Sequence, residues 1–96
     1  MVAMADIQRH RDVILGLAAS HGADNVRVFG SVVRGEAASG SDVDLLLRFE
    51  PRCSLVDHVA LKQDLEDLLG CRVEVVEDEG LRCGLRERIL AEAVAL

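Results

Sequence analysis

The alternation of hydrophobic and polar positions along this chain predicts an ordered series of helices and strands. Apolar residues recur at helical spacing in three segments: residues 4–21, 54–69 and 81–95. Short apolar runs with the length of buried strands appear in three others: residues 25–29, 42–49 and 71–76. A single helical turn is predicted over residues 31–35, and a polar, glycine-bounded loop over residues 35–41.

The order of these segments predicts how the strands pair. The link between residues 25–29 and 42–49 is too short for a crossover helix, so we expect that pair to be antiparallel. A helix joins residues 42–49 to residues 71–76, which favours a parallel pair. The sequence therefore predicts an α/β fold: one domain over residues 1–96, with a small mixed three-stranded sheet and flanking helices.

Composition and charge narrow the class of protein. Half of the residues are apolar but only two are aromatic, which indicates either a tightly packed aliphatic core or an apolar surface between subunits of an oligomer. The net charge of −6 argues against stable binding to nucleic acid, which usually needs clustered Lys and Arg. No secretory or membrane-spanning run is present, and the three cysteines have no disulfide or zinc spacing, so we expect a cytoplasmic protein without a membrane partner.

Two aspartates interrupt an otherwise apolar strand. Asp42 and Asp44 are two positions apart, so a strand places both side chains on one face while Val43 and Leu45 point to the other. Neighbouring carboxylates repel each other unless a cation lies between them, and Mg²⁺ prefers such oxygen ligands. The alternative is that the pair consists of ordinary turn residues at an exposed strand start.

A glycine-serine turn precedes the aspartates and is predicted to lie beside them. If the first two strands are antiparallel, the end of the first strand meets the start of the second, which brings Gly30 and Ser31 next to Asp42 and Asp44. Glycine allows backbone to approach a ligand closely, and the free N–H groups of a helical turn suit a phosphate. The two features together describe a site for a nucleoside triphosphate, although a Gly-Ser pair alone often marks only a turn.

This stretch resembles the signature of the minimal nucleotidyltransferases, within the DNA polymerase β-like nucleotidyltransferase superfamily. Residues 30–49, GSVVRGEAASGSDVDLLLRF, match the pattern G-S-x-x-R-G, a short polar loop, and then S-D-x-D-L-L. The later segments LLGCRVEVV and ILAEAVAL are similar to the family too. The resemblance implies transfer of a nucleoside monophosphate, AMP from ATP being the expected case, from an Mg²⁺-bound triphosphate to a hydroxyl.

The resemblance also implies roles for individual residues. Gly30 and Ser31 would hold the triphosphate tail, and Asp42 and Asp44 would bind one or two Mg²⁺ ions. Arg34 falls on the basic position of the motif and would assist with the phosphates; its alternative is a solvated surface charge.

A third carboxylate is expected on the neighbouring strand. In the family this residue is commonly an aspartate in a V-D-[LV]-V context, and the corresponding segment here reads VEVV, so the candidate is Glu74. Glutamate can ligate Mg²⁺ or accept a proton from the attacking hydroxyl, but its extra methylene changes the reach of the carboxylate. The alternative is a solvent-facing glutamate on an edge strand.

The resemblance extends to the antitoxin half of toxin–antitoxin pairs. The usual partner there is a helical HEPN-type toxin, which adenylylation of a hydroxyl can silence. The first hypothesis is therefore an Mg²⁺-dependent protein adenylyltransferase that acts as an antitoxin. Two alternatives stay open: a non-catalytic module that neutralises its partner by stoichiometric contact, and transfer to a small molecule, which normally needs a further substrate domain.

Overall fold

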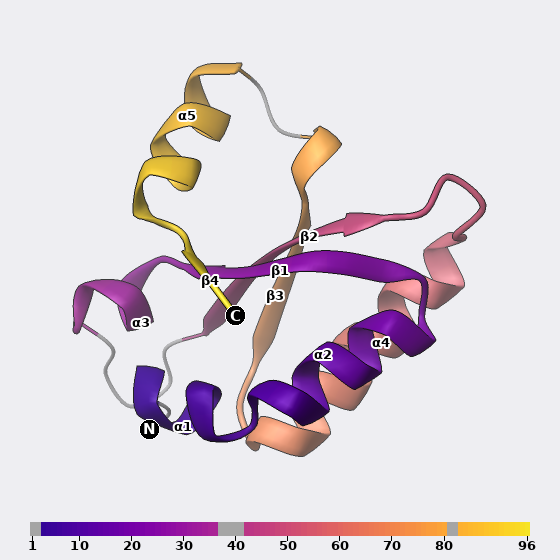
Figure 1. Ribbon diagram of the computed structural model, residues 1–96, viewed down its shortest axis with the longest axis horizontal. Helices are drawn as coiled ribbons and strands as arrows, with labels where there is room; N and C mark the ends of the chain where they lie inside the picture. The colour runs from indigo at the N-terminus through magenta and orange to yellow at the C-terminus, as the bar shows by residue number, and fades with distance from the viewer. Residues whose placement is uncertain (1–2, 37–41, 81–82) are drawn as a thin grey trace.

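The computed structural model describes residues 3–36, 42–80 and 83–96 of the chain (Figure 1). The helices are α1 (Met4–Arg9), α2 (Arg11–Ser20), α3 (Ser31–Arg34), α4 (Leu55–Leu69) and α5 (Cys83–Glu92), with a 3₁₀ turn, η1 (Asp78–Gly80). The strands are β1 (Ala23–Phe29), β2 (Val43–Phe49), β3 (Val73–Glu77) and β4 (Val94–Ala95). Most of the predicted loop over residues 35–41 lies outside the described residues.

The sheet confirms the predicted pairing but has one strand more than predicted. Its order is β3-β2-β1-β4, with β1 antiparallel to β2 and β2 parallel to β3. The prediction of a mixed α/β sheet with flanking helices is therefore confirmed, and the prediction of three strands is wrong. The last helix was expected to continue to residue 95, but it ends at Glu92, and Val94 and Ala95 pair with β1.

The fourth strand and a break in the N-terminal helix are the two departures from the predicted elements. A two-residue strand carries no periodic signal of its own, so β4 could not be told from a continued helix. The single helix predicted over residues 4–21 is two helices, because the backbone of His10 leaves the helical region with φ −97° and ψ 13°. The His10 ring turns back, and its Nδ1 lies 2.8 Å from the carbonyl oxygen of Asp6.

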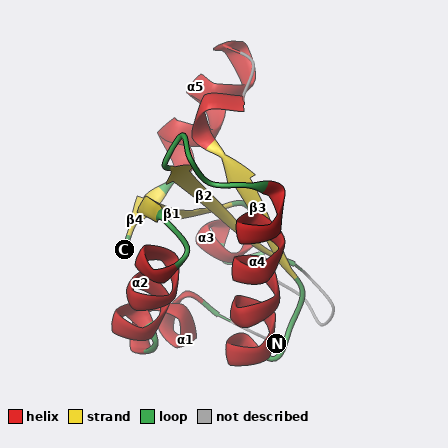
Figure 2. Cartoon of the chain, turned by 90° about the vertical axis from the view of Figure 1, so that its right-hand side faces the viewer, coloured by secondary structure: helices red, strands yellow, loops and turns green. Residues whose placement is uncertain are grey.

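The two faces of the sheet have different contents. One face packs against α2 and α4, where side chains such as Leu45, Leu47, Leu61 and Leu65 are fully buried. The α5 helix lies on the opposite side of the sheet from α2 and α4 (Figure 2). Because side chains alternate along β2, Asp44 lies on this second side, away from the aliphatic core. No helix in the described part of the chain is long and apolar enough to cross a membrane.

Candidate active site

The pairing of the strands brings two of the predicted carboxylates side by side. Asp44 of β2 is the register partner of Glu74 in the parallel β2–β3 pair. On its other side Asp44 is paired with Phe29, the last residue of β1. Asp42 lies just before β2 and is half-buried. Because it is two positions from Asp44, its side chain lies on the same face of the sheet. The three carboxylates thus share one end of one sheet face.

The glycine of the predicted turn is packed directly against Asp44. Gly30 has φ 85° and ψ −156°, a region that only glycine adopts without strain. A Cβ at this position would lie 3.1 Å from Cγ of Asp44 and closer still to its carboxylate oxygen. The turn therefore needs glycine for two reasons, the backbone angle and the space taken by Asp44. The predicted juxtaposition of the Gly-Ser turn and the aspartates is present in the structure.

The single turn of α3 presents an arginine beside this site. Ser31 begins α3, and Gly35 ends it in the left-handed conformation with φ 73°. The Arg34 side chain is about half exposed and donates hydrogen bonds to Glu36 and Glu92. Its positive charge reaches Asp44, where it opposes the rise of the pKa. Arg34 therefore lies within electrostatic reach of Asp44 and is paired with Glu36 and Glu92.

Sequence reasoning missed Glu92, the last residue of α5. Its Oε2 accepts a hydrogen bond from the backbone N–H of Gly30 at 3.2 Å, and its Oε1 accepts one from Arg34. These contacts span 62 and 58 residues along the chain. A glutamate near the end of an amphipathic helix has no sequence signal that sets it apart from other charged helix residues.

Of the three carboxylates, Asp44 is the one whose charged form the surroundings disfavour. Burial raises the pKa of Asp44 above its ordinary value, and the charges of Asp42 and Glu74 raise it further. Like charges held together in this way are costly without a cation, and a hard divalent cation with oxygen ligands would remove that cost. The donor set therefore fits Mg²⁺.

The carboxylates do not form a closed cage as they stand. Among the residues that the structure describes, no group of three or more His, Cys, Asp or Glu side chains is close enough to hold a metal ion. The carboxylate of Asp42 instead lies 3.8 Å from Nε of Arg72, an exposed residue. Binding of a cation would accordingly require rotation of side chains at the strand ends, which are the exposed part of the site.

A second carboxylate on this side of the sheet has opposite surroundings. Asp78 belongs to the acidic run of residues 77–79, yet only 7% of this residue is exposed. Oδ2 of Asp78 lies 2.7 Å from Arg27 and Oδ1 lies 2.7 Å from Arg86. Asp78 thus ties β1 and α5 to η1. The two arginines lower its pKa, Arg86 having the larger effect.

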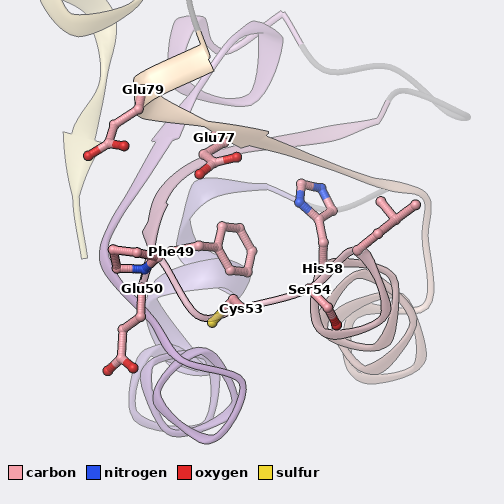
Figure 3. A pocket seen from close by; sticks show the side chains of 9 residues that line it. Phe49, Glu50, Cys53, Ser54, His58, Glu77 and Glu79 are labelled. Carbon is pink, nitrogen blue, oxygen red and sulfur yellow. The ribbon is translucent and has the colours of Figure 1, made fainter.

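A separate cavity lies at the far end of β2. It has a volume of about 300 Å³ and is lined by residues that include Phe49, Glu50, His58 and Glu77 (Figure 3). The rings of Phe49 and His58 are stacked with centroids 4.9 Å apart, and His58 Nε2 lies 3.2 Å from the carbonyl oxygen of Val75. These contacts hold α4 against the sheet, so the histidine has a structural role.

Comparison with known proteins agrees with this geometry. The model of the nucleotidyltransferase domain family matches residues 11–96. The chain belongs to this family. As a nucleotidyltransferase it is similar to the protein adenylyltransferase MntA of Thermococcus cleftensis, with 45% identity over 73 residues that cover 76% of this chain and 74% of the relative.

Two solved structures show the same fold. One, assigned as a minimal nucleotidyltransferase, superposes with a TM-score of 0.89 at 49% identity and covers 99% of this chain and 97% of its own. The other is the tri-AMPylated HEPN toxin of Shewanella oneidensis in complex with an MNT antitoxin, with a TM-score of 0.69 at 17% identity. This match covers 92% of the nucleotidyltransferase chain and 69% of the other, and it shows the fold alone.

Proposed function

We propose that this nucleotidyltransferase transfers AMP from Mg²⁺-bound ATP to a hydroxyl of a partner protein, a helical HEPN-type toxin, and so acts as its antitoxin. The observation that carries the proposal is the packing of Gly30 against Asp44, which itself is paired with Glu74. A turn suited to phosphate and a set of carboxylates suited to a divalent cation thus occupy one corner of the sheet. The similarity to a protein named as an adenylyltransferase supports AMP as the transferred group.

Each residue of the corner has a role in this proposal. Gly30, Ser31 and Arg34 hold the triphosphate, the first two through the backbone of the turn and the arginine through its guanidinium. Asp42, Asp44 and Glu74 hold one or two Mg²⁺ ions. The bound ions supply positive charge to the phosphate oxygens and the attacking oxygen.

The transfer itself is a substitution at the α-phosphorus. The acceptor oxygen forms a bond to the α-phosphorus, the bond between the α-phosphorus and the bridging oxygen breaks, and pyrophosphate leaves. The proton of the acceptor hydroxyl passes to a carboxylate of this corner. The exposure of Glu74, which leaves its carboxylate open to an incoming acceptor, supports this residue for that role. Arg34 meanwhile balances the charge of the phosphates.

The acceptor is the finer part of the proposal. The MntA relative is named as an enzyme that modifies proteins, and the S. oneidensis complex contains an AMPylated HEPN toxin beside an MNT antitoxin. Both names support a protein hydroxyl as the acceptor of this chain.

Labelled ATP tests the proposal directly. The purified protein is incubated with Mg²⁺ and ATP labelled at the α-phosphate, with and without a co-expressed HEPN-type toxin, and parallel reactions use the γ-phosphate label. The Asp42→Asn/Asp44→Asn variant removes the proposed ligands. The matched control, Asp12→Asn/Asp67→Asn, removes the same charge from two exposed positions on α2 and α4.

We expect label on the toxin from the α-phosphate only, lost in the first variant and kept in the control. Absence of transfer, with the toxin bound equally by the wild type and by Asp42→Asn/Asp44→Asn, would replace the proposal by a non-catalytic binding module. Transfer to a small molecule but never to protein would retain the chemistry and reject the acceptor.

A further inference from the structure

The carboxylate of Glu92 binds both of the groups that the proposed function assigns to phosphate in this corner. One oxygen accepts the Gly30 N–H and the other accepts the Arg34 guanidinium. Two acceptor oxygens on one negatively charged centre, each held by one of these donors, reproduce the arrangement in which a phosphate group would be bound. The Glu92 carboxylate therefore occupies two donors that the proposed function assigns to a phosphate group.

Anchoring of α5 does not account for this residue. The beginning of α5 is already tied to the body of the protein by the ion pair of Arg86 with the buried Asp78. Its end is followed after one residue by β4, which pairs with β1 through Val94 and Ala95. The helix is thus held at both ends by contacts that do not involve Glu92.

Electrostatics also make Glu92 a poor choice for stability alone. Its charge raises the pKa of Asp44, as the charges of Asp42 and Glu74 do. Glu92 therefore adds a fourth negative charge near three carboxylates that already repel one another. The side chain of Glu92 is only 24% exposed, which limits relief by solvent. The favourable partners that offset this cost are Gly30 and Arg34.

There is room for a ligand beside the contact. A cavity of about 410 Å³ lies between α5 and the turn, lined by Phe29, Gly30, Arg34, Glu92 and three residues of α5. A phosphate that entered this space would meet the two donors only after the Glu92 carboxylate had moved away. A change of the Glu92 side-chain rotamer would free the two donors without movement of α5, which β4 and Asp78 keep in place.

We propose that Glu92 is a built-in competitor of the nucleotide: it occupies the Gly30 N–H and Arg34 in the nucleotide-free protein and is displaced when a triphosphate binds. The inference rests on the proposed function, since it takes the phosphates to bind at this turn. This competition lowers the observed affinity for nucleotide, because the contacts of Glu92 must be broken before the phosphates can bind. Removal of the charge should therefore tighten binding, whereas removal of an ordinary ligand-holding residue would weaken it.

The test compares Glu92→Gln with Glu87→Gln, which removes the same charge from an exposed position of the same helix. Isothermal titration gives the Kd of each protein for Mg-ATP, for inorganic tripolyphosphate and for adenosine. We expect Glu92→Gln to bind ATP and tripolyphosphate about tenfold more tightly, because a charge-assisted hydrogen bond is replaced by a weaker neutral one. Adenosine binding and the Glu87→Gln variant should be unchanged.

Other outcomes separate this inference from the proposed function. Unchanged or weaker binding of ATP by Glu92→Gln, in a wild type that binds ATP, overturns the competitor and leaves the nucleotide site intact. An equal gain in Glu87→Gln also overturns it, since general charge would then be the cause. Failure of all three proteins to bind ATP or tripolyphosphate overturns both proposals.

A measurement on the wild type does not depend on folding of the variant. The side-chain carboxyl carbon of Glu92 and the amide proton of Gly30 are followed by NMR while Mg-ATP is added. Both resonances should move together as nucleotide binds. A Glu92 resonance that stays fixed at saturating ATP contradicts displacement.

Discussion

Asp44 and Asp78 lie on the same side of the sheet, and their surroundings differ in sign. Each oxygen of Asp78 is bound by an arginine, and the pKa of this carboxyl is lowered. Asp44 is half-buried beside two other carboxylates, and its pKa is raised. The charge of Asp78 is neutralised within the chain, whereas the proposed function leaves the charge of Asp44 for a bound cation to neutralise. Variants that remove one charge at a time test this difference between the two carboxylates.

Removal of the Asp44 charge should have the largest effect, and it should fall on activity alone. Asp44→Asn is expected to lower the transfer rate roughly a thousandfold or more, since loss of a metal ligand forfeits several kcal/mol of charge stabilisation. Its Tm in the absence of divalent cations should equal or slightly exceed that of the wild type, because the variant relieves repulsion. A large fall in Tm would show that Asp44 is structural, like Asp78.

The next effect concerns Glu74, the register partner of Asp44 on β3. Glu74→Gln should lower kcat about a hundredfold, because a misplaced or missing group near the reacting atoms costs about that much. Glu74→Asp keeps the carboxylate and should retain more of the rate than Glu74→Gln. Steady-state kinetics of label transfer check both variants. Equal rates for Glu74→Gln and the wild type would make Glu74 a solvent-facing edge residue.

Removal of the Asp78 charge should reverse the pattern. Asp78→Asn leaves two arginines without their shared partner and is expected to lower the free energy of unfolding by about 2–3 kcal/mol. For a chain of this size that is a fall of about 10 °C or more in Tm. The exposed neighbour variant Glu79→Gln is the control and should be nearly neutral. Activity of Asp78→Asn should persist where the protein is folded; its loss in the folded protein would place Asp78 in the site.

The smallest expected effect is on the pH dependence of stability. Asp44 and Asp78 should contribute to it with opposite sign when Tm is measured in EDTA between pH 3.5 and 7. The folded pKa of Asp78 is below the ordinary 3.8, so its stabilisation is present above that pH and is lost as pH falls. The folded pKa of Asp44 is above 3.8, so the contribution of Asp44 to stability declines as pH rises from 3.8 through that pKa.

The Tm deficit of Asp78→Asn should therefore shrink toward low pH, while the Tm gain of Asp44→Asn should grow toward neutral pH and vanish near pH 3.5. Added Mg²⁺ should abolish the gain of Asp44→Asn. Parallel curves for the two variants would contradict the difference between the residues.

The surroundings of Asp44 could largely be predicted from local sequence pattern. Asp42 and Asp44 interrupt an apolar strand, and the short link from Gly30 forces an antiparallel pair, so their meeting follows from period and connection length. Glu74 could be placed on the neighbouring strand, and the structure adds its register with Asp44. These features depend on residues that are close in sequence or on adjacent elements.

The surroundings of Asp78 and the position of Glu92 could not be predicted, because they depend on contacts between residues far apart in the sequence. Asp78 reads as one acid in an acidic run, and its burial depends on Arg27, which is 51 residues away. Glu92 and β4 likewise depend on where the end of the chain docks. Burial of a charged side chain is decided by its distant partner, and sequence spacing carries no information on that partner.

The distance along the chain between Gly30 and Glu92 also has a consequence in time. A ribosome releases the polypeptide from its N-terminus at about 5–20 residues per second. The turn at Gly30 and the carboxylates of β2 and β3 are therefore made before Glu92, which follows Gly30 by 62 residues. Any structure that the nascent chain forms through β3 contains the turn proposed to bind phosphate before Glu92, the proposed competitor, has been synthesised.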